Sequence, residues 1–414
     1  MEPLPKGANF IRAKTLWEIG LHIAGNPATP YGGNRDMVIT IGSGSGTAFR
    51  PWLRLATGSA ILAEEVAKGD GVDLAFVNPS ALLTQAYRGV GLFSRPLPVR
   101  IVAVYPSWDR FVFLVHPRTG IRSLADIKAS RYPLRVSVRE DATHSTIVLI
   151  DQAFALHGFA LKDIESWGGR LIRCGGQGDI RRLEPLGRGE IDAVFDEGII
   201  LWLDAALAAG LSPIALAPNE FDALSRLGWR KVSLPKSRFP RLARDVDTLD
   251  FSGWPIYGNA SLPDEVAYDI CGALAAREPE IPWEKGTGGT ALHMVRESDS
   301  TPMDVPLHPG AERWYRALAE RIAEAGEVCR DIVARDPRNV LGLRMLGVAE
   351  RKAAALSTDQ RASLRLIILN SSSSVSSKSS ATSLGNFGQI MHTMQRLSVV
   401  PGMFSPFMAI ACVP

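Results

Sequence analysis

Four side chains in the first half of this 414-residue chain form the most suggestive group for binding a ligand. Arg139 follows a predicted buried strand, and Thr143, His144 and Ser145 lie where a helix is predicted to begin. The planar guanidinium of arginine can bond both oxygens of a carboxylate, and hydroxyls and unpaired amides at a helix start also suit an anion. The spacing therefore predicts a site for a small carboxylate, with Arg139 as the clamp.

Simpler roles for the same residues stay open. Asp141 or Thr143 would cap the helix, which is compatible with ligand binding. Arg139 would pair with Glu140 or Asp141 on the surface, where such a pair contributes little. His144 would act as a general base beside the neighbouring hydroxyl, but adjacent residues on a helix point in different directions. Catalysis by His144 is the less favoured interpretation.

A pair of acids, Asp196 and Glu197, follows another predicted strand. Ligands in open α/β sheets sit beyond the carboxyl ends of the strands, so both acids are candidate site residues. Two carboxylates there could share a proton, interact favourably with the positive end of the next helix dipole, or bind an ammonium group. The last role would apply if the ligand were an amino acid.

The N-terminal part of the chain also carries polar side chains at predicted strand ends and helix starts. A glycine-rich turn at residues 42–47 lets backbone amides approach an anion. It matches neither a P-loop, nor a dinucleotide-binding fingerprint, nor a nucleophile elbow, so a plain turn stays open as an interpretation. Tyr105 and Trp254 add aromatic rings that would line a pocket or belong to the core. The candidate hydroxyl and amide residues are Ser45, Thr47, Thr57, Ser59, Asn78 and Ser80.

Composition narrows the class of protein that positions these residues. Hydrophobic residues make up 46% of the chain and charged residues 21%, which is typical of a globular protein and excludes wholesale disorder. The formal net charge of +3 argues against a sequence-general nucleic-acid binder. The four cysteines lie far apart and the histidines show no metal-ligand spacing, so we expect no disulfide framework, metal or cofactor.

Short β-rich runs alternate with helical patterns along the chain, which predicts α/β architecture. The predicted strands are residues 37–41, 72–77, 100–105, 110–115, 134–138 and 191–195. The predicted helices are residues 15–24, 60–67, 81–87, 124–129, 143–157, 199–208, 264–276 and 311–325.

An internal similarity suggests that the chain contains two related lobes. Residues 69–78 (GDGVDLAFVN) resemble residues 189–196 (GEIDAVFD), because each is the end of a predicted helix at a glycine and an acid, followed by an aspartate and a buried strand. We therefore predict that Asp73 and Asp192 begin equivalent strands in two separate sheets. A ligand cleft would then lie between the lobes, although chance similarity of two ordinary helix–strand units is the alternative.

The two ends of the chain differ from its middle. Eight serines lie between residues 371 and 380, and no acid follows Asp359. Such a tract buries too little apolar surface to fold, so residues beyond about 355 are expected to be a disordered tail. We find no transmembrane segment, and no unbroken apolar run of a secretory signal near the N-terminus.

These motifs together resemble the solute-binding proteins of TAXI-type TRAP transporters. The resemblance is carried by KGDGVDLAFVN (68–78), TGIRSLADIK (119–128), GEIDAV (189–194), SLPDEVAY (261–268) and, most specifically, PLHPGAERWY (306–315). Residues 57–59 resemble that family's helix start. Residues 136–146 resemble its second-lobe ligand loop, although the loop in this chain is more charged than the family's. The resemblance covers about residues 37–319.

The resemblance implies a two-lobed α/β fold of the type II periplasmic-binding-protein kind. It implies a periplasmic, monomeric protein that closes on a small organic anion and passes it to a TRAP membrane component. The sequence itself shows no signal, so a cytoplasmic location stays open. Two other functions also stay open. One is an enzyme on the same fold, namely a decarboxylase or dehydratase of a cyclic or aromatic acid, and the other is a cytoplasmic sensor.

The expected domain organisation follows from this fold. Its parts are an N-terminal helical segment at 1–36, the first part of lobe 1 at 37–110, lobe 2 at 111–250, a return to lobe 1 with closing helices at 251–330, and the tail at 355–414.

Overall fold

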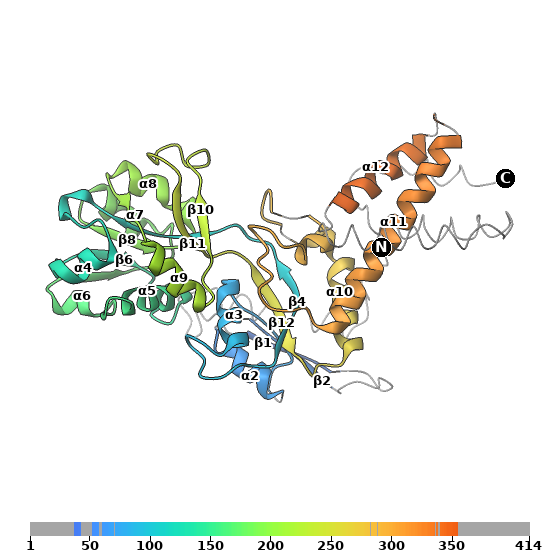
Figure 1. Cartoon of the computed structure of the whole chain (residues 1–414), viewed down its shortest axis with the longest axis horizontal. Coiled ribbons are helices and arrows are strands. Elements are labelled where there is room, and N and C mark those ends of the chain that lie inside the picture. Colours follow the sequence, from blue (N-terminus) through green and yellow to red (C-terminus); the bar gives the residue numbers. More distant parts are fainter. Residues whose placement is uncertain are drawn as a thin grey trace. The chain divides into compact units, whose positions relative to one another are not determined.

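The computed structural model describes two compact units of the chain, drawn in Figure 1. The described residues are 37–42, 52–57, 60–69, 71–281, 283–287, 289–335, 337 and 340–354. Among them, the smaller unit contains residues 263–296 and 309–354, and the larger contains residues 37–262 and 297–308. The predictions for the helix at 15–24, for Ser45, Thr47 and Ser59, and for the serine-rich tail fall outside the described residues.

The larger unit contains two separate β-sheets, labelled in Figure 1. The first sheet has the strand order β1-β2-β3-β12-β4. Its strands are β1 (Met37–Gly42), β2 (Trp52–Thr57), β3 (Leu74–Phe76), β12 (Trp254–Asn259) and β4 (Val99–Tyr105). The second sheet has the order β10-β11-β5-β8-β6-β7, and β9 also pairs with β5. Its strands are β5 (Arg110–Val115), β6 (Arg135–Val138), β7 (Arg170–Arg173), β8 (Ala193–Asp196), β9 (Ser212–Pro213), β10 (Lys231–Leu234) and β11 (Val246–Asp250).

Helices alternate with these strands, as the sequence predicts for an α/β protein. The helices of the larger unit are α2 (Leu62–Lys68), α3 (Ser80–Arg88), η1 (Pro117–Thr119), α4 (Leu124–Ser130), α5 (Ser145–Ala155), α6 (Asp163–Ser166), α7 (Ile180–Gly187), η2 (Ile199–Leu201), α8 (Leu203–Ala208) and α9 (Pro218–Arg226). Those of the smaller unit are α10 (Asp264–Ala276), η3 (Glu278–Glu280), η4 (Ala291–Met294), α11 (Pro309–Arg335) and α12 (Val340–Ala354).

The second sheet is buried on both faces at strand β5. Successive side chains of a strand point to opposite faces. Along β5, Phe111 and Phe113 belong to the core that contains α4, α5 and α6, whereas Val112 and Leu114 belong to the core that contains α7 and α8. A strand covered on both sides must be apolar throughout, which explains the continuous run after Arg110.

The internal similarity in the sequence corresponds to the same bonding pattern in both sheets, which confirms the prediction for Asp73 and Asp192. Asp73 precedes β3, and its carboxylate accepts the backbone N–H of Arg54 on the parallel strand β2 (2.7 Å). Asp192 precedes β8, and its carboxylate accepts the backbone N–H of Arg135 on the parallel strand β6 (3.0 Å). In both cases the aspartate N–H bonds back to the arginine carbonyl.

Several predicted elements need correction. Residues 57–59 were expected to begin a helix, but Thr57 ends strand β2 opposite Met37, and the helix begins at Leu62. The run 199–208 is divided into η2 and α8 at Trp202. Helix α11 is longer than predicted, and α12 follows it before the expected tail. Pairing with a neighbouring strand and packing against a neighbouring helix are long-range effects that local patterns do not contain.

Helices α10 and α11 of the smaller unit approach very closely at Gly310. A Cβ atom at this position would lie 2.0 Å from the carbonyl oxygen of Asp264. Nearby, Cys271 and Tyr315 are buried, and burial raises the pKa of the Cys271 thiol to about 12. Glycine at position 310 therefore permits the contact between the two helices.

Candidate functional site

The carboxyl ends of two neighbouring strands bring Arg139 together with Asp196 and Glu197. Strands β6 and β8 run parallel, with Ser137 opposite Val194, so the residues after each strand meet at one edge of the sheet. Arg139 Nε donates to Asp196 Oδ1 at 2.9 Å, and a terminal nitrogen of Arg139 pairs with Glu197 Oε1. The side chains are 7%, 0% and 8% exposed, respectively, so this is a buried ion-pair group.

Arg182 from α7 provides a second buried guanidinium. Its Nη1 lies 2.7 Å from Asp196 Oδ2, and its Nε donates to Ser137 Oγ at 2.9 Å. Burial raises the pKa of the Asp196 carboxyl above its usual range, and the guanidiniums of Arg139 and Arg182 oppose this increase. Two guanidiniums and two carboxylates are thus placed together in one buried group.

His144 contacts the same group from the start of α5. Its Nδ1 accepts the backbone N–H of Thr146 at 3.1 Å, and its Nε2 lies 3.9 Å from Glu197 Oε1. His144 therefore caps the helix, which corrects the expectation that Asp141 or Thr143 does so. The carboxylate of Asp141 instead accepts the N–H of Thr143 at 2.8 Å and its hydroxyl at 2.7 Å. We call Arg139, His144, Arg182, Asp196 and Glu197 the Arg139 cluster.

The Arg139 cluster is connected to one of two short segments that cross between the sheets. These segments, residues 106–109 and 251–253, join β4 to β5 and β11 to β12. Asp109 accepts the N–H of Gly198, directly after Glu197, at 2.9 Å, and the N–H of Arg110 at 2.7 Å. Burial raises the pKa of Asp109 to about 7, although these backbone bonds lower it. The turn that carries Glu197 is therefore fixed to a crossing segment.

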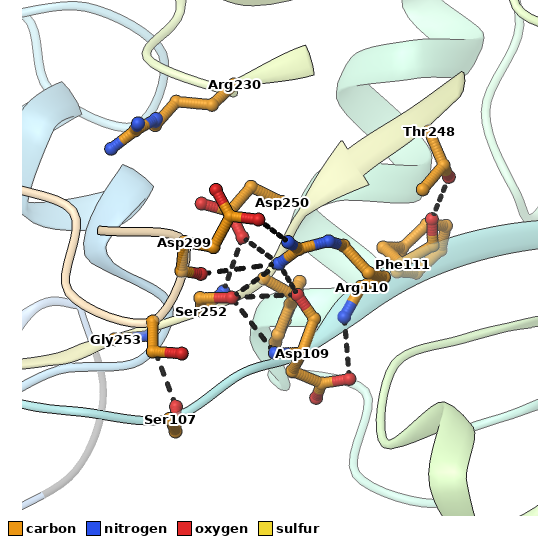
Figure 2. Close-up of polar contacts among 12 residues, drawn as sticks. Ser107, Asp109, Arg110, Phe111, Arg230, Thr248, Asp250, Ser252, Gly253 and Asp299 are labelled. Atoms are coloured by element: carbon orange, nitrogen blue, oxygen red, sulfur yellow. Dashed lines mark hydrogen bonds and ion pairs between the residues drawn. The ribbon is translucent and has the colours of Figure 1, made fainter. Parts of the chain in front are cut away.

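Arg110 holds the two crossing segments together, as Figure 2 shows. Its side chain is fully buried and donates to Asp250 Oδ1 (2.9 Å) and to Ser252 Oγ (2.8 Å). It also bonds Asp299 Oδ2 at 3.2 Å. Burial lowers the pKa of Arg110, and Asp250 is the strongest of the carboxylates that oppose this change. We call Arg110, Asp250, Ser252 and Asp299 the Arg110 clamp, which the sequence did not predict.

The candidate residues of the first sheet lie by the crossing segments. Asn78 Nδ2 donates to the carbonyls of Phe251 (3.4 Å) and Gly253 (3.1 Å). Ser80 begins α3, and its backbone N–H bonds the carbonyl of Ser252 at 3.3 Å. The turn after β3 is thus fixed to the second crossing segment, much as the turn after β8 is fixed to the first.

The remaining candidates lie at strand ends and at the start of α5. Tyr105 and Trp254 face each other as register partners at the ends of β4 and β12, and Trp254 is 42% exposed. Thr143 is exposed and Ser145 is half-buried. The structure therefore joins Arg139, His144, Asp196 and Glu197 directly, and it adds Arg182 and Gln177 to them. Gln177 Nε2 donates to Glu197 at 2.8 Å.

The described ranges contain neither a candidate metal-binding group of side chains nor a candidate membrane-spanning helix. Within them, no group of three or more His, Cys, Asp and Glu residues is arranged to hold a metal ion. The helices of those ranges are also too short or too polar to cross a bilayer.

Comparison with known proteins gives distant structural matches. No model of a known protein family matches the chain. A structure described as a periplasmic transporter is 17% identical over 64% of this chain and 80% of its own, with a TM-score of 0.28. An R. palustris protein solved with adipate is 18% identical over 62% and 78%, with a TM-score of 0.28. A binding protein component of an ABC phosphonate transporter from Pseudomonas aeruginosa is 12% identical over 73% and 85%, with a TM-score of 0.27.

Proposed function

We propose that this protein binds a small organic carboxylate at the Arg139 cluster. The observation that carries the proposal is the pair of buried guanidiniums, Arg139 and Arg182, at the carboxyl edge of parallel strands β6 and β8. Arginine suits such a position because its planar fork can bond both oxygens of a carboxylate and stays charged when buried. The start of the 11-residue helix α5, capped by His144, adds the partial positive charge of a helix N-terminus beside it.

The two crossing segments support a binding mechanism in which the sheets close on the ligand. Each segment is short, and each is bonded to the turn after one of the equivalent strands β3 and β8. A relative rotation of the two sheets would concentrate its backbone changes in residues 106–109 and 251–253, as in hinge closure around a ligand. Closure would remove the carboxylate from water and strengthen its bonds to the guanidinium. In this proposal Ser145 adds a hydroxyl donor to the ligand, and Thr143 adds another after its hydroxyl leaves Asp141.

We further propose that the protein is the solute-binding component of a TRAP-type transporter of the TAXI family and acts in the periplasm. This assignment is supported by the sequence motifs at 119–128 and 306–315. It predicts a monomer whose partner, besides the ligand, is a TRAP membrane component. A pull-down with that membrane component, with and without ligand, would test it.

Calorimetric titration of wild type and Arg139→Lys with a panel of small carboxylates tests the binding site. An ammonium cannot reproduce the fork, so loss of a buried charge-assisted partner should cost about 2–5 kcal/mol, well over tenfold in affinity. Arg181→Lys is the matched control, because Arg181 is 60% exposed and pairs with Asp179 at 2.6 Å. Equal affinity of Arg139→Lys and wild type would contradict the proposed site.

A further inference from the structure

We infer that Glu197 is an internal counter-ion of Arg139 that a ligand carboxylate displaces, so that binding exchanges one carboxylate for another. This inference rests on the proposed function and concerns the regulation of the same site. It explains how a guanidinium that is already paired inside the protein can still serve as a clamp.

The charges of the Arg139 cluster make such an exchange necessary. Arg139 bonds Asp196 through Nε and Glu197 through a terminal nitrogen, and Arg182 pairs with Asp196. Two guanidiniums therefore already face two carboxylates, and the pKa of a further buried carboxyl, Asp109, is raised by burial and also by the nearby charge of Asp196. A third carboxylate, added without loss of another, would place like charges together in a poorly solvated site, which is strongly unfavourable.

Asp196 is the carboxylate that stays. It is the last residue of strand β8 and is completely buried. It accepts from Arg139 Nε at 2.9 Å and from the backbone N–H of Glu197 at 2.9 Å, and it lies 2.7 Å from Arg182. Moving this side chain would leave the buried guanidinium of Arg182 without its ion-pair partner.

Glu197 is the carboxylate that can leave. It lies one residue beyond the end of β8, in the turn before Gly198, whose φ is 63°. Apart from Arg139, its side chain bonds the neutral amide of Gln177, which carries no charge to be left unbalanced. A ligand carboxylate would take the position of Glu197 at the terminal nitrogen of Arg139.

His144 is placed to receive Glu197 after its release. His144 Nδ1 accepts the N–H of Thr146, so in the neutral ring the proton lies on Nε2. Nε2 faces Glu197 Oε1 at 3.9 Å, which is beyond a hydrogen bond but within a small side-chain movement. Glu197 would thus move from one donor to another without entering an apolar environment.

The test is the affinity of Glu197→Gln for acetate, succinate and benzoate, measured by calorimetric titration. Glutamine keeps the shape of the side chain and its bond to Gln177 but removes the competing charge. We expect this variant to bind a carboxylate at least about tenfold more tightly than wild type. Glu197→Asp, which keeps the charge on a shorter stem, should give an intermediate gain. Glu140→Gln is the matched control, because Glu140 is 61% exposed in the same region.

Each outcome decides between the inference and the function on which it rests. Tighter binding by Glu197→Gln, and no change in Glu140→Gln, supports the exchange. Equal or weaker binding by Glu197→Gln overturns it, while binding by wild type still supports the proposed function. Carboxylate binding by Glu197→Gln and not by wild type supports Glu197 as a counter-ion and overturns the proposed function. Failure of every variant to bind overturns both.

Discussion

Replacing Arg110 with methionine tests the Arg110 clamp, because the change removes a fully buried guanidinium. Its effect is concentrated on Asp250, whose side chain is only 5% exposed and would lose its charged partner. Breaking a buried ion pair in this way typically costs about 3–5 kcal/mol of folding free energy. Asp299 is 78% exposed, so loss of its ion pair with Arg110 should contribute only about 0–1 kcal/mol to the destabilisation. Ser252 keeps its bonds to the backbone of Asp109.

The cost of Arg110→Met should depend on pH. Burial already raises the pKa of Asp250, and Arg110 is among the groups that oppose the increase. Without Arg110 the folded-state pKa rises further above the unfolded value. A carboxyl of this kind contributes stability that is present below its unfolded pKa and is lost as pH rises through its folded pKa. The deficit of the variant, meaning its loss of unfolding free energy relative to wild type, should therefore be largest at about pH 8 and smaller at about pH 5.

Urea unfolding followed by tryptophan fluorescence at both pH values measures this deficit. Adding Asp250→Asn to Arg110→Met should recover most of the loss, because no unpaired charge is then buried. Arg238→Met is the control: Arg238 is exposed, stacks on Trp108 at 3.6 Å, and should cost only about 0.5–1 kcal/mol. A deficit for Arg110→Met below about 1 kcal/mol, or one equal at both pH values, would refute the reasoning.

Two further predictions concern Asp109 and Gly310. The pKa of Asp109 is raised to about 7, so its contribution to stability should be lost as pH rises through that value, and Asp109→Asn should flatten this part of the stability–pH curve. Urea unfolding at a series of pH values checks this, and an unchanged slope would contradict it. Gly310→Ala should destabilise the smaller unit by about 1–3 kcal/mol, since its Cβ would lie 2.0 Å from Asp264 O. Thermal unfolding measures the loss, and Gly326→Ala should show none, because its nearest neighbour would be 3.6 Å away.

Parts of the fold and site could be predicted because they depend on local patterns and one topological rule. The apolar run after Arg110 predicted strand β5, and the helix predicted at 124–129 is α4, whose start is capped by the Ser123 hydroxyl accepting the N–H of Asp126 at 3.2 Å. Arg139, Asp196 and Glu197 meet because parallel strands end at one edge of a sheet.

Other parts depend on contacts between residues distant in sequence. Arg182 lies on α7, which carries Pro185 inside the helix and several charges, so the sequence predicted only that a helix ends near Gly189, but it predicted neither its bounds nor the role of Arg182. The Arg110 clamp joins residues 140 and 142 positions apart. A charged residue at the head of an otherwise apolar strand indicates that a buried partner must exist, but it does not identify that partner.

The position of β12 has a consequence for how the chain folds during synthesis. Strand β12 lies between β3 and β4 in the first sheet, yet it follows the whole second sheet in sequence. A ribosome therefore releases β5 to β11 before the strand that pairs β3 with β4. The second sheet can form as a continuous stretch of nascent chain, whereas β3 and β4 keep unpaired edges until β12 emerges. A chain that ends before residue 254 should thus contain every strand of the second sheet, whereas β3 and β4 of the first sheet lack the strand that joins them.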